Sequence, residues 1–472
     1  MRAVAVEPVL AQVEREFEHS VARLVELLRI PSVGTDPAFD ADTRRAAAWL
    51  VERLRAVGFE ASLRPTEGQP MVVAHDRSAP AGAPHLLYYG HYDVQPPDPL
   101  ELWQSPPFEP VRVEGPHGPR LVARGAVDDK GQLMTWLEAL AAWKAVHGAL
   151  PVRVSVLIEG EEESSSKSLE PFLLANREEL AADLCVISDT GMLGVDQPAI
   201  TTMLRGIAYF EIELGGPAHD LHSGMFGGAV LNPIHVLCRM LADLHDSEGR
   251  IRLPGFYDAV VELSAEQKAQ WAAIPFDERA FLAAAGLDRS TGEAGRSILE
   301  RLWARPSCDV NGIWGGYTGE GSKTVIPARA SAKLSFRLVP DQDPAAVAGQ
   351  LRAFLEARTP AGCRLRITEM GAGAPIRVPT DSPFLAAARR ALARVFGKEP
   401  ALIGCGGSIP VTASIKRHLG MDSLLLGFGL DDDRVHSPNE KFELVCYKRG
   451  ILAHAAFLAE AAAIGGRAPA AR

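Results

Sequence analysis

The chain has 472 residues, 47% of them hydrophobic, and a formal net charge of −10. This length exceeds the roughly 250–300 residues at which a single core stops growing, so two domains are expected. The acidic balance argues against nucleic acid as a partner, because phosphate binding requires a basic surface. No stretch reaches the ~20 apolar residues of a membrane span.

The N-terminus and the cysteines indicate a cytoplasmic protein. The first twenty residues carry early acids and no uninterrupted apolar core, which predicts an amphipathic helix and not a signal peptide. The six cysteines are scattered without a CxxC pair, as is usual for a long chain in a reducing compartment.

The first two hundred residues alternate strand-like and helix-like segments. Short apolar runs predict strands at 85–90, 152–158 and 184–188, and apolar residues at helical spacing predict helices at 43–57 and 130–147. Strands separated by helices predict an α/β domain with a mostly parallel central sheet.

The pattern then changes to half-exposed strands. Apolar and polar residues alternate at 208–214, 330–338 and 364–367, with helix patterns at 232–244 and 345–357. These segments predict an α+β domain at 201–376. From 382 the α/β pattern returns, with helices at 382–396 and 447–464 around a strand at 423–426. We therefore expect a discontinuous α/β domain, 1–200 and 377–472, that contains the inserted one.

Acids and one histidine follow the predicted strands. His91 and Asp93 follow the first strand, Glu161–Glu163 the second, and Asp189 the third, while Asp128 and Asp129 precede a helix. Ligands of open α/β sheets bind beyond the carboxyl ends of the strands, so these side chains are candidates for one cleft.

Each of these features also has an ordinary explanation. His91 alone could be a hydrogen-bonded histidine, Asp128-Asp129 a helix cap, the glutamate run a solvated face, and Asp189 a turn residue. Asp93 is placed to accept a proton from the His91 imidazole and orient it. Three like charges directly after a buried strand require a cation, however, and the joint occurrence favours a metal site.

Nine ordered motifs resemble the M20 metallopeptidase family, in particular its dipeptidase branch. They are YYGHYDVQP (88–96), RGAVDDKG (124–131), EGEEESSS (159–166), ISD (187–189), DLHSG (220–224), KTVIP (323–327), FRLVP (336–340), GGSIPVT (406–412) and HSPNEK (436–441). The resemblance runs over nearly the whole chain. Ser165 stands where the family usually has glycine.

The resemblance implies a site for two divalent ions per subunit. His91 and Asp189 would hold one ion, Glu163 and His436 the other, and Asp128 would bridge them, followed by a cis peptide bond. Asp93 would orient His91. Glu162 would be the general base, although a register shifted by one residue would give the roles to Glu161 and Glu162 instead. The mixed donor set suits zinc, with manganese or cobalt as alternatives.

The inserted domain is expected to act as a lid and to make a homodimer. By resemblance, His222 would stabilise the oxyanion in the active site of the partner subunit, and Arg337 would pair with the substrate carboxylate. Thr324 and Ser408 would be smaller substrate contacts. A turn histidine and a surface arginine are the ordinary alternatives for His222 and Arg337.

The expected function is hydrolysis of the peptide bond of dipeptides or short peptides by a metal-activated water. One alternative is hydrolysis of another small amide, such as an N-acyl amino acid, because one fold hosts several reactions. Another is a metal-binding regulatory protein without catalysis. Glu162 beside a complete ligand set argues against the latter, since a binding module needs no spare base.

Overall fold

The computed structural model describes residues 5–407 and 409–465, which form two compact units. The first unit comprises Met1–Thr202, Val378–Leu402 and Ser414–Arg472, and the second comprises Met203–Arg377 and Ile403–Ala413. The second unit thus contains a short segment that the sequence analysis placed in the other domain. Two hydrogen bonds tie this segment to Arg205 of the same unit, from Arg205 N to Cys405 O (3.2 Å) and from Arg205 Nε to Gly406 O (3.1 Å).

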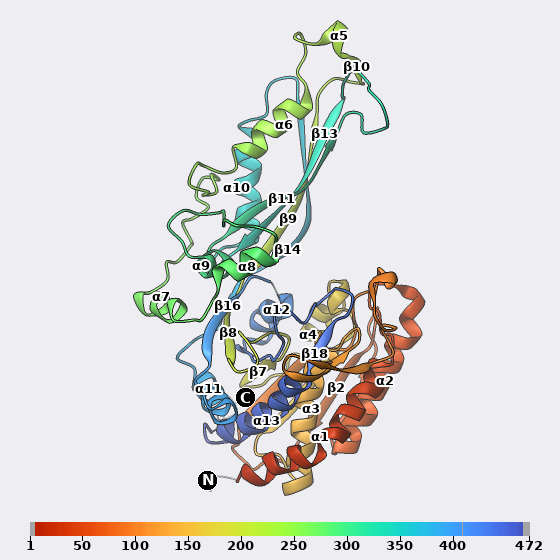
Figure 1. Ribbon diagram of the computed structural model, residues 1–472, viewed down its shortest axis with the longest axis vertical. Helices are drawn as coiled ribbons and strands as arrows, with labels where there is room; N and C mark the ends of the chain where they lie inside the picture. Colours follow the sequence, from red (N-terminus) through yellow and green to blue (C-terminus); the bar gives the residue numbers. More distant parts are fainter. Residues whose placement is uncertain (1–4, 408, 466–472) are drawn as a thin grey trace. The chain divides into compact units, whose positions relative to one another are not determined.

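The first unit is built on a mixed nine-stranded sheet (Figure 1). Its order is β1-β2-β6-β3-β7-β17-β8-β15, with β16 paired to β8. The strands are β1 (Glu60–Arg64), β2 (Met71–Asp76), β3 (His85–His91), β6 (Arg153–Glu159), β7 (Leu184–Ile187), β8 (Ala199–Leu204), β15 (Ile376–Arg377), β16 (Ala401–Cys405) and β17 (Ser423–Leu425).

Parallel pairing occurs at the centre of this sheet. Strands β6, β3, β7 and β17 are parallel neighbours, whereas β1, β2, β8 and β15 pair antiparallel. The α/β fold class is confirmed, but the sheet is mixed and not mostly parallel as expected. The link between β1 and β2 is too short for the crossover of a dozen or more residues that parallel strands need.

Helices cover the central strands, which explains why β3, β6 and β7 are buried almost throughout. Helix α3 packs against both α1 and α13 (Figure 1). Its Trp136 stacks on Tyr88 with ring centroids 4.9 Å apart, and its Trp143 Nε1 donates to Ala455 O (3.0 Å). The helices are α1 (Glu7–Leu28), α2 (Asp40–Val57), α3 (Lys130–His147), α4 (Leu169–Ala175), α11 (Pro383–Phe396), α12 (Pro410–Leu419) and α13 (Leu444–Ala462).

Shorter elements complete the first unit. Three 3-10 helices are η1 (Pro37–Phe39), η2 (Leu100–Leu102) and η3 (Glu162–Ser164), and a small antiparallel sheet contains β4 (Val111–Gly115), β5 (Gly118–Val122) and β18 (Lys441–Glu443). None of the described helices combines the length and apolar composition that a bilayer crossing needs.

The second unit is an antiparallel sheet packed against helices. Its order is β11-β13-β9-β14, and a separate ribbon pairs β10 with β12. Burial alternates residue by residue along β9, so one face lies in the core and contributes Phe210, Ile212 and Leu214. The strands are β9 (Gly206–Gly215), β10 (Leu221–His222), β11 (Ser307–Gly315), β12 (Val325–Ile326), β13 (Arg329–Leu338) and β14 (Arg364–Gly373).

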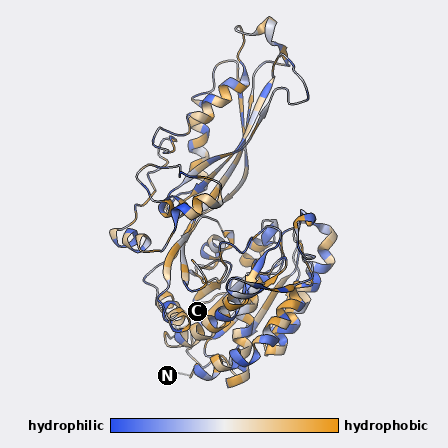
Figure 2. Cartoon of the chain, in the orientation of Figure 1, coloured by the Kyte–Doolittle hydropathy of each residue, from blue (hydrophilic) through white to orange (hydrophobic). Residues whose placement is uncertain are grey.

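Helices α6 and α10 supply the other side of this core. Leu237 of α6 and Leu351 of α10 are fully buried among the sheet residues. Figure 2 shows both hydrophobic and hydrophilic residues along these helices, as expected for helices with one buried face. The helices are α5 (Ser223–Phe226), α6 (Pro233–Ala242), α7 (Ala265–Ala272), α8 (Glu278–Ala284), α9 (Ile298–Trp303) and α10 (Pro344–Glu356).

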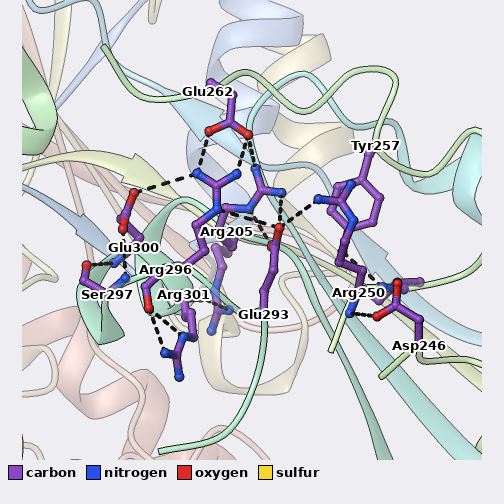
Figure 3. Close-up of polar contacts among 12 residues, drawn as sticks. Arg205, Asp246, Arg250, Tyr257, Glu262, Glu293, Arg296, Ser297, Glu300 and Arg301 are labelled. Carbon is purple, nitrogen blue, oxygen red and sulfur yellow. Dashed lines mark hydrogen bonds and ion pairs between the residues drawn. The ribbon is translucent and has the colours of Figure 1, made fainter. Parts of the chain in front are cut away.

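An ion-pair network holds the segment between α6 and β11, which contains the short helices α7, α8 and α9 (Figure 3). Glu293 accepts two hydrogen bonds from Arg305, both of 2.7 Å, and one from Arg250 (3.1 Å). Glu262 accepts two from Arg296 and one from Arg305. Because Glu293 and Arg305 are buried, their bidentate pairing compensates the loss of water around both charges.

Candidate metal centre

The central parallel strands bring the predicted donors to one edge of the sheet. Strand β3 ends at His91 and pairs with both β6 and β7, so that His91 lies opposite Glu159 and Tyr89 lies opposite Ile187. The loop that carries Glu161–Glu163, called the glutamate loop below, follows β6 directly, and Asp189 lies two residues beyond β7. Parallel strands present their carboxyl ends together, which is why these distant segments meet.

The first donor group contains His91, Asp128 and Asp189, whose ligand atoms lie within 4.8 Å of one another. His91 Nε2 is 3.2 Å from Asp128 Oδ1 and 3.9 Å from Asp189 Oδ2. Asp128 comes from the loop before α3, and its peptide bond to Asp129 is cis, as the resemblance implied.

The second donor group contains Asp128, Glu163 and His436, and it meets the same distance limit. His436 Nε2 is 2.9 Å from Asp128 Oδ2 and 3.4 Å from Glu163 Oε2. The two oxygens of Asp128 therefore face different groups, as a bridging carboxylate requires. All five predicted ligands lie in the first unit.

His91 is held in one tautomer by Asp93, although by a different atom from the one expected. His91 Nδ1 donates to the backbone oxygen of Asp93 (3.1 Å), and the Asp93 carboxylate is farther away (3.4 Å). Because a carbonyl oxygen can only accept, Nδ1 carries a proton, and Nε2 is the nitrogen left to bind a metal ion.

The Asp93 carboxylate instead fixes the glutamate loop. It accepts hydrogen bonds from the backbone amides of Glu162 (3.3 Å) and Glu163 (3.0 Å). One aspartate thus orients the histidine through its backbone and the two glutamates through its side chain.

The three glutamates of the loop point to different partners. Glu161 accepts from the backbone amide of Ser168 (3.2 Å) and belongs to neither donor group. Glu163 accepts from Gln95 Nε2 (2.7 Å) through the oxygen that faces His436. This geometry favours the register in which Glu163 is the ligand and Glu162 the base.

Crowding of buried acids shifts several pKa values. Burial and the Asp128 carboxylate raise the pKa of Asp189 to about 7. Burial, Asp189 and Glu163 raise the pKa of Glu162 to about 8, against the opposing effect of His91. Hydrogen bonds with Asp128 and Glu163 raise the pKa of His436 to about 10. Such a cluster favours bound positive charge, whether protons or metal cations.

The donor set fits a pair of divalent ions. His91 Nε2 and Glu163 Oε1 are buried without a hydrogen-bond partner, and both belong to residues of the donor groups. Orphaned polar atoms of this kind are costly unless a ligand satisfies them. Two imidazoles and three carboxylates suit zinc or manganese better than the harder calcium ion.

Several neighbours of the centre had been given no role at the metal site from the sequence. Gln95 holds Glu163, Asp129 Oδ2 accepts from the backbone amide of His91 (3.2 Å), and Glu440 accepts from the backbone amide of Asp128 (3.1 Å). All three lie inside motifs already recognised, so their positions in YYGHYDVQP, RGAVDDKG and HSPNEK were the available signal.

The predicted substrate residues fall in the second unit or outside the described residues. The β10–β12 ribbon places His222 opposite Val325, and the amide of Ser223 donates to Thr324 O (3.0 Å), so the two predicted residues are neighbours. Arg337 lies on β13 opposite Ser307. Ser408 lies outside the described residues.

Comparison with known proteins gives consistent matches over nearly the whole chain. Residues 87–460 match peptidase family M20/M25/M40. The Cys-Gly metallodipeptidase DUG1 of Saccharomyces cerevisiae is 32% identical over 456 residues, which are 93% of this chain and 94% of the relative. The human Beta-Ala-His dipeptidase is 35% identical over 399 residues, which are 83% of this chain and 78% of the relative.

Two solved structures of related proteins have the same fold over nearly the whole chain. The crystal structure of human carnosine dipeptidase 1 superposes with a TM-score of 0.81 at 32% identity and covers 98% of this chain and 99% of that one. The M20 family metallo-carboxypeptidase Sso-CP2 from Sulfolobus solfataricus gives a TM-score of 0.82 at 33% identity, covering 94% and 99%.

Proposed function

The chain belongs to peptidase family M20/M25/M40, and from this membership we propose that it is a metal-dependent dipeptidase. The observation that carries the proposal is the pair of donor groups that share Asp128, with Glu162 beside them. The relatives named above are dipeptidases by name, which favours short peptides as substrates over other amides.

His91, Asp128, Asp189, Glu163 and His436 would hold two divalent ions, with zinc as the proposed metal. When bound, such a pair supplies Lewis acidity that polarises the scissile carbonyl and lowers the pKa of a water. The other residues would then orient the metal ligands, transfer protons and bind the substrate.

Glu162 is the proposed general base. Its carboxylate belongs to neither donor group, and it makes no hydrogen bond with the described part of the chain, so it is free to accept a proton from the attacking water. The same carboxylic acid would then protonate the departing amine.

Substrate recognition is assigned to the second unit. We propose that His222 stabilises the oxyanion, that Arg337 pairs with the terminal carboxylate, and that Thr324 and Ser408 make smaller contacts. His222 is exposed, and its Nδ1 accepts from the backbone amide of Gly224 (3.0 Å), which leaves Nε2 as the nitrogen that can donate to a substrate.

A homodimer through the second unit is part of the proposal. Strand β11 is an edge strand that exposes Val310, Ile313 and Trp314 by 47%, 52% and 45%. Exposed apolar residues on an open sheet edge favour association with another chain. We also propose a cytoplasmic location, in keeping with the buried thiols of Cys185, Cys308 and Cys446.

The direct test is turnover of a dipeptide panel after metal removal and reloading with zinc or manganese, with N-acyl amino acids as comparison substrates. We expect dipeptides to be cleaved and the metal-free protein to be inactive. Cleavage of N-acyl amino acids alone would reject the dipeptidase assignment and favour the amide alternative.

A further inference from the structure

The carboxylate of Glu440 is fully buried and accepts four hydrogen bonds from a single loop. Its Oε2 accepts from Arg124 Nη1 (2.7 Å) and the amide of Gly125 (2.9 Å). Its Oε1 accepts from the amides of Val127 (3.0 Å) and Asp128 (3.1 Å). Both oxygens are therefore satisfied by the segment that ends in the shared aspartate of the two donor groups.

The guanidinium of Arg124 links Glu440 to the backbone of Pro96. Arg124 is 1% exposed, and its Nη2 donates to Pro96 O (3.1 Å) while its guanidinium lies 5.5 Å from the centre of the Trp103 ring. A buried carboxylate is stable only when paired and hydrogen-bonded, so the loop must keep this conformation as long as Glu440 stays ionised.

The segment that carries Glu440 also carries His436. Its backbone is tied to the residue that follows β5 by the hydrogen bond from Ala123 N to Glu440 O (3.1 Å). Asn439 adds two contacts, accepting from Gln104 N (2.7 Å) and donating to Leu102 O (2.8 Å). The chain near residue 125 and the chain near residue 438 are thereby fixed to each other.

We propose that Glu440 is a positioning residue that sets where Asp128 and His436 lie relative to each other. These two ligands come from segments more than three hundred residues apart in the chain, yet His436 Nε2 lies 2.9 Å from Asp128 Oδ2. Glu440 binds the backbone amide of Asp128 itself, so a displaced carboxylate displaces the ligand. The inference rests on the proposed function, because it supposes that these residues hold metal ions.

A buried ion pair could instead serve stability alone, and Glu138 provides the matched control. It lies in the same unit, is 4% exposed, and accepts from Ser20 Oγ (3.0 Å), Arg23 Nε (2.8 Å) and Arg53 Nη2 (3.2 Å). It contacts neither the donor groups nor the loop before Asp128. Both glutamates are therefore buried and bound by arginine, but only Glu440 accepts a hydrogen bond from a proposed metal ligand, Asp128.

The test compares Glu440→Gln with Glu138→Gln as metal-free proteins. Whichever way the new amide at position 440 turned, its NH₂ group would face two N–H donors, so the loop must shift. We expect the zinc affinity, measured by chelator competition, to fall by about 10- to 100-fold in the Glu440 variant, the usual effect of losing a partner of a metal ligand. The Glu138 variant should keep the wild-type affinity.

A second variant guards against a failure to fold. Glu440→Gln alone leaves the Arg124 charge buried without its partner, which can be strongly destabilising. The double variant Arg124→Met/Glu440→Gln removes both charges and should fold. It should still bind zinc more weakly, and the amide protons of Val127 and Asp128 should exchange faster with solvent than in the wild-type protein.

Wild-type zinc affinity together with wild-type amide exchange in the Glu440 variants would overturn the inference. An equal loss of affinity in Glu138→Gln would overturn it too, because the effect would then be one of general stability. A wild-type protein that binds no divalent ion would refute the proposed function itself, a separate and recognisable outcome.

Discussion

At the scale of single residues, the centre is a cluster of charges in which each side chain has one task. His91 has Nε2 as its metal-binding nitrogen because its other nitrogen donates to a carbonyl oxygen. Asp128 offers one oxygen to each donor group. Glu162 belongs to neither donor group, and its carboxylate makes no hydrogen bond with the described side chains.

Glu162→Gln should retain both metal ions and lose turnover by about 10²- to 10⁴-fold, because the amide cannot accept the proton of the attacking water. Metal content and steady-state turnover are the two measurements. Glu161→Gln is the control, since Glu161 accepts from the Ser168 amide and should tolerate the change. If Glu161→Gln were the inactive variant, the register of the loop would be shifted by one residue.

The stability of the metal-free protein should fall as the pH rises from about 5.5 to about 8.5. Asp189 and Glu162 have folded-state pKa values of about 7 and about 8, above their unfolded values. A group whose pKa is raised by folding stabilises the protein below its unfolded pKa, and this stabilisation is lost as the pH passes the folded value.

The measurement is the melting temperature at both pH values, before and after zinc loading. A difference of more than about 2 °C is expected, because about 1 kcal/mol shifts the melting temperature by about 2–4 °C in a domain of 150–250 residues and by less in a larger protein. Zinc should reduce the difference, because the bound ions replace the protons. A metal-free protein that melted at a higher temperature at pH 8.5 would contradict the charge crowding.

At the scale of elements, the lengths and ends of strands and helices position the chemistry. Strand β3 places His85 at one end and His91 at the other, and only the carboxyl end meets the glutamate loop. Helix α3 begins directly after Asp128-Asp129 and ends at Gly148, whose φ of 71° suits glycine. The donors thus lie at the end of a buried strand, as His91 does, or on the loops next to the buried elements.

Helix α10 contains an exposed glycine that has no conformational task. Gly349 lies in the helix interior with a negative φ, and nothing lies within 4 Å of the position that a Cβ would take. Gly349→Ala should therefore raise the free energy of unfolding by about 0.5–1 kcal/mol, through the lower entropy of the unfolded chain. Chemical denaturation measures this, and a loss of stability would mean that the helix is distorted there.

At the scale of the whole molecule, the proposal assigns His222 to the active site of the partner subunit. Glu162→Gln and His222→Ala should each be nearly inactive alone. Mixing the two under exchange conditions should restore activity in about a quarter of the sites, because half of the dimers are mixed and each has one intact site.

The recovery is measured as turnover after mixing, with each variant alone as the reference. Ile313→Lys on β11, which should prevent dimerisation, should abolish the recovery. Leu63→Lys, at an exposed site on β1 of the first unit, is its control. Absence of recovery in dimers that exchange subunits would place His222 in the site of its own chain or outside the site.

Local patterns in the sequence were enough to predict several elements. The predicted helix at 130–147 has the bounds of α3, and strands 85–90 and 208–214 lie within β3 and β9. Their apolar periods are long or bounded by glycine, which makes them readable without neighbours. Short elements such as β4, β18 and α7 were not predicted. They contain too few residues to show a clear helical or alternating pattern of apolar side chains.

The ordered motifs also identified the family and the five candidate donors, because these residues lie at recognisable places in the chain. How the donors meet follows from the folded chain alone. Strand register and loop backbone decide which oxygen of Asp128 faces each donor group. They also decide that the carbonyl of Asp93 orients His91 and that Glu440 is buried. Contacts between segments hundreds of residues apart leave no local pattern, so sequence spacing cannot specify them.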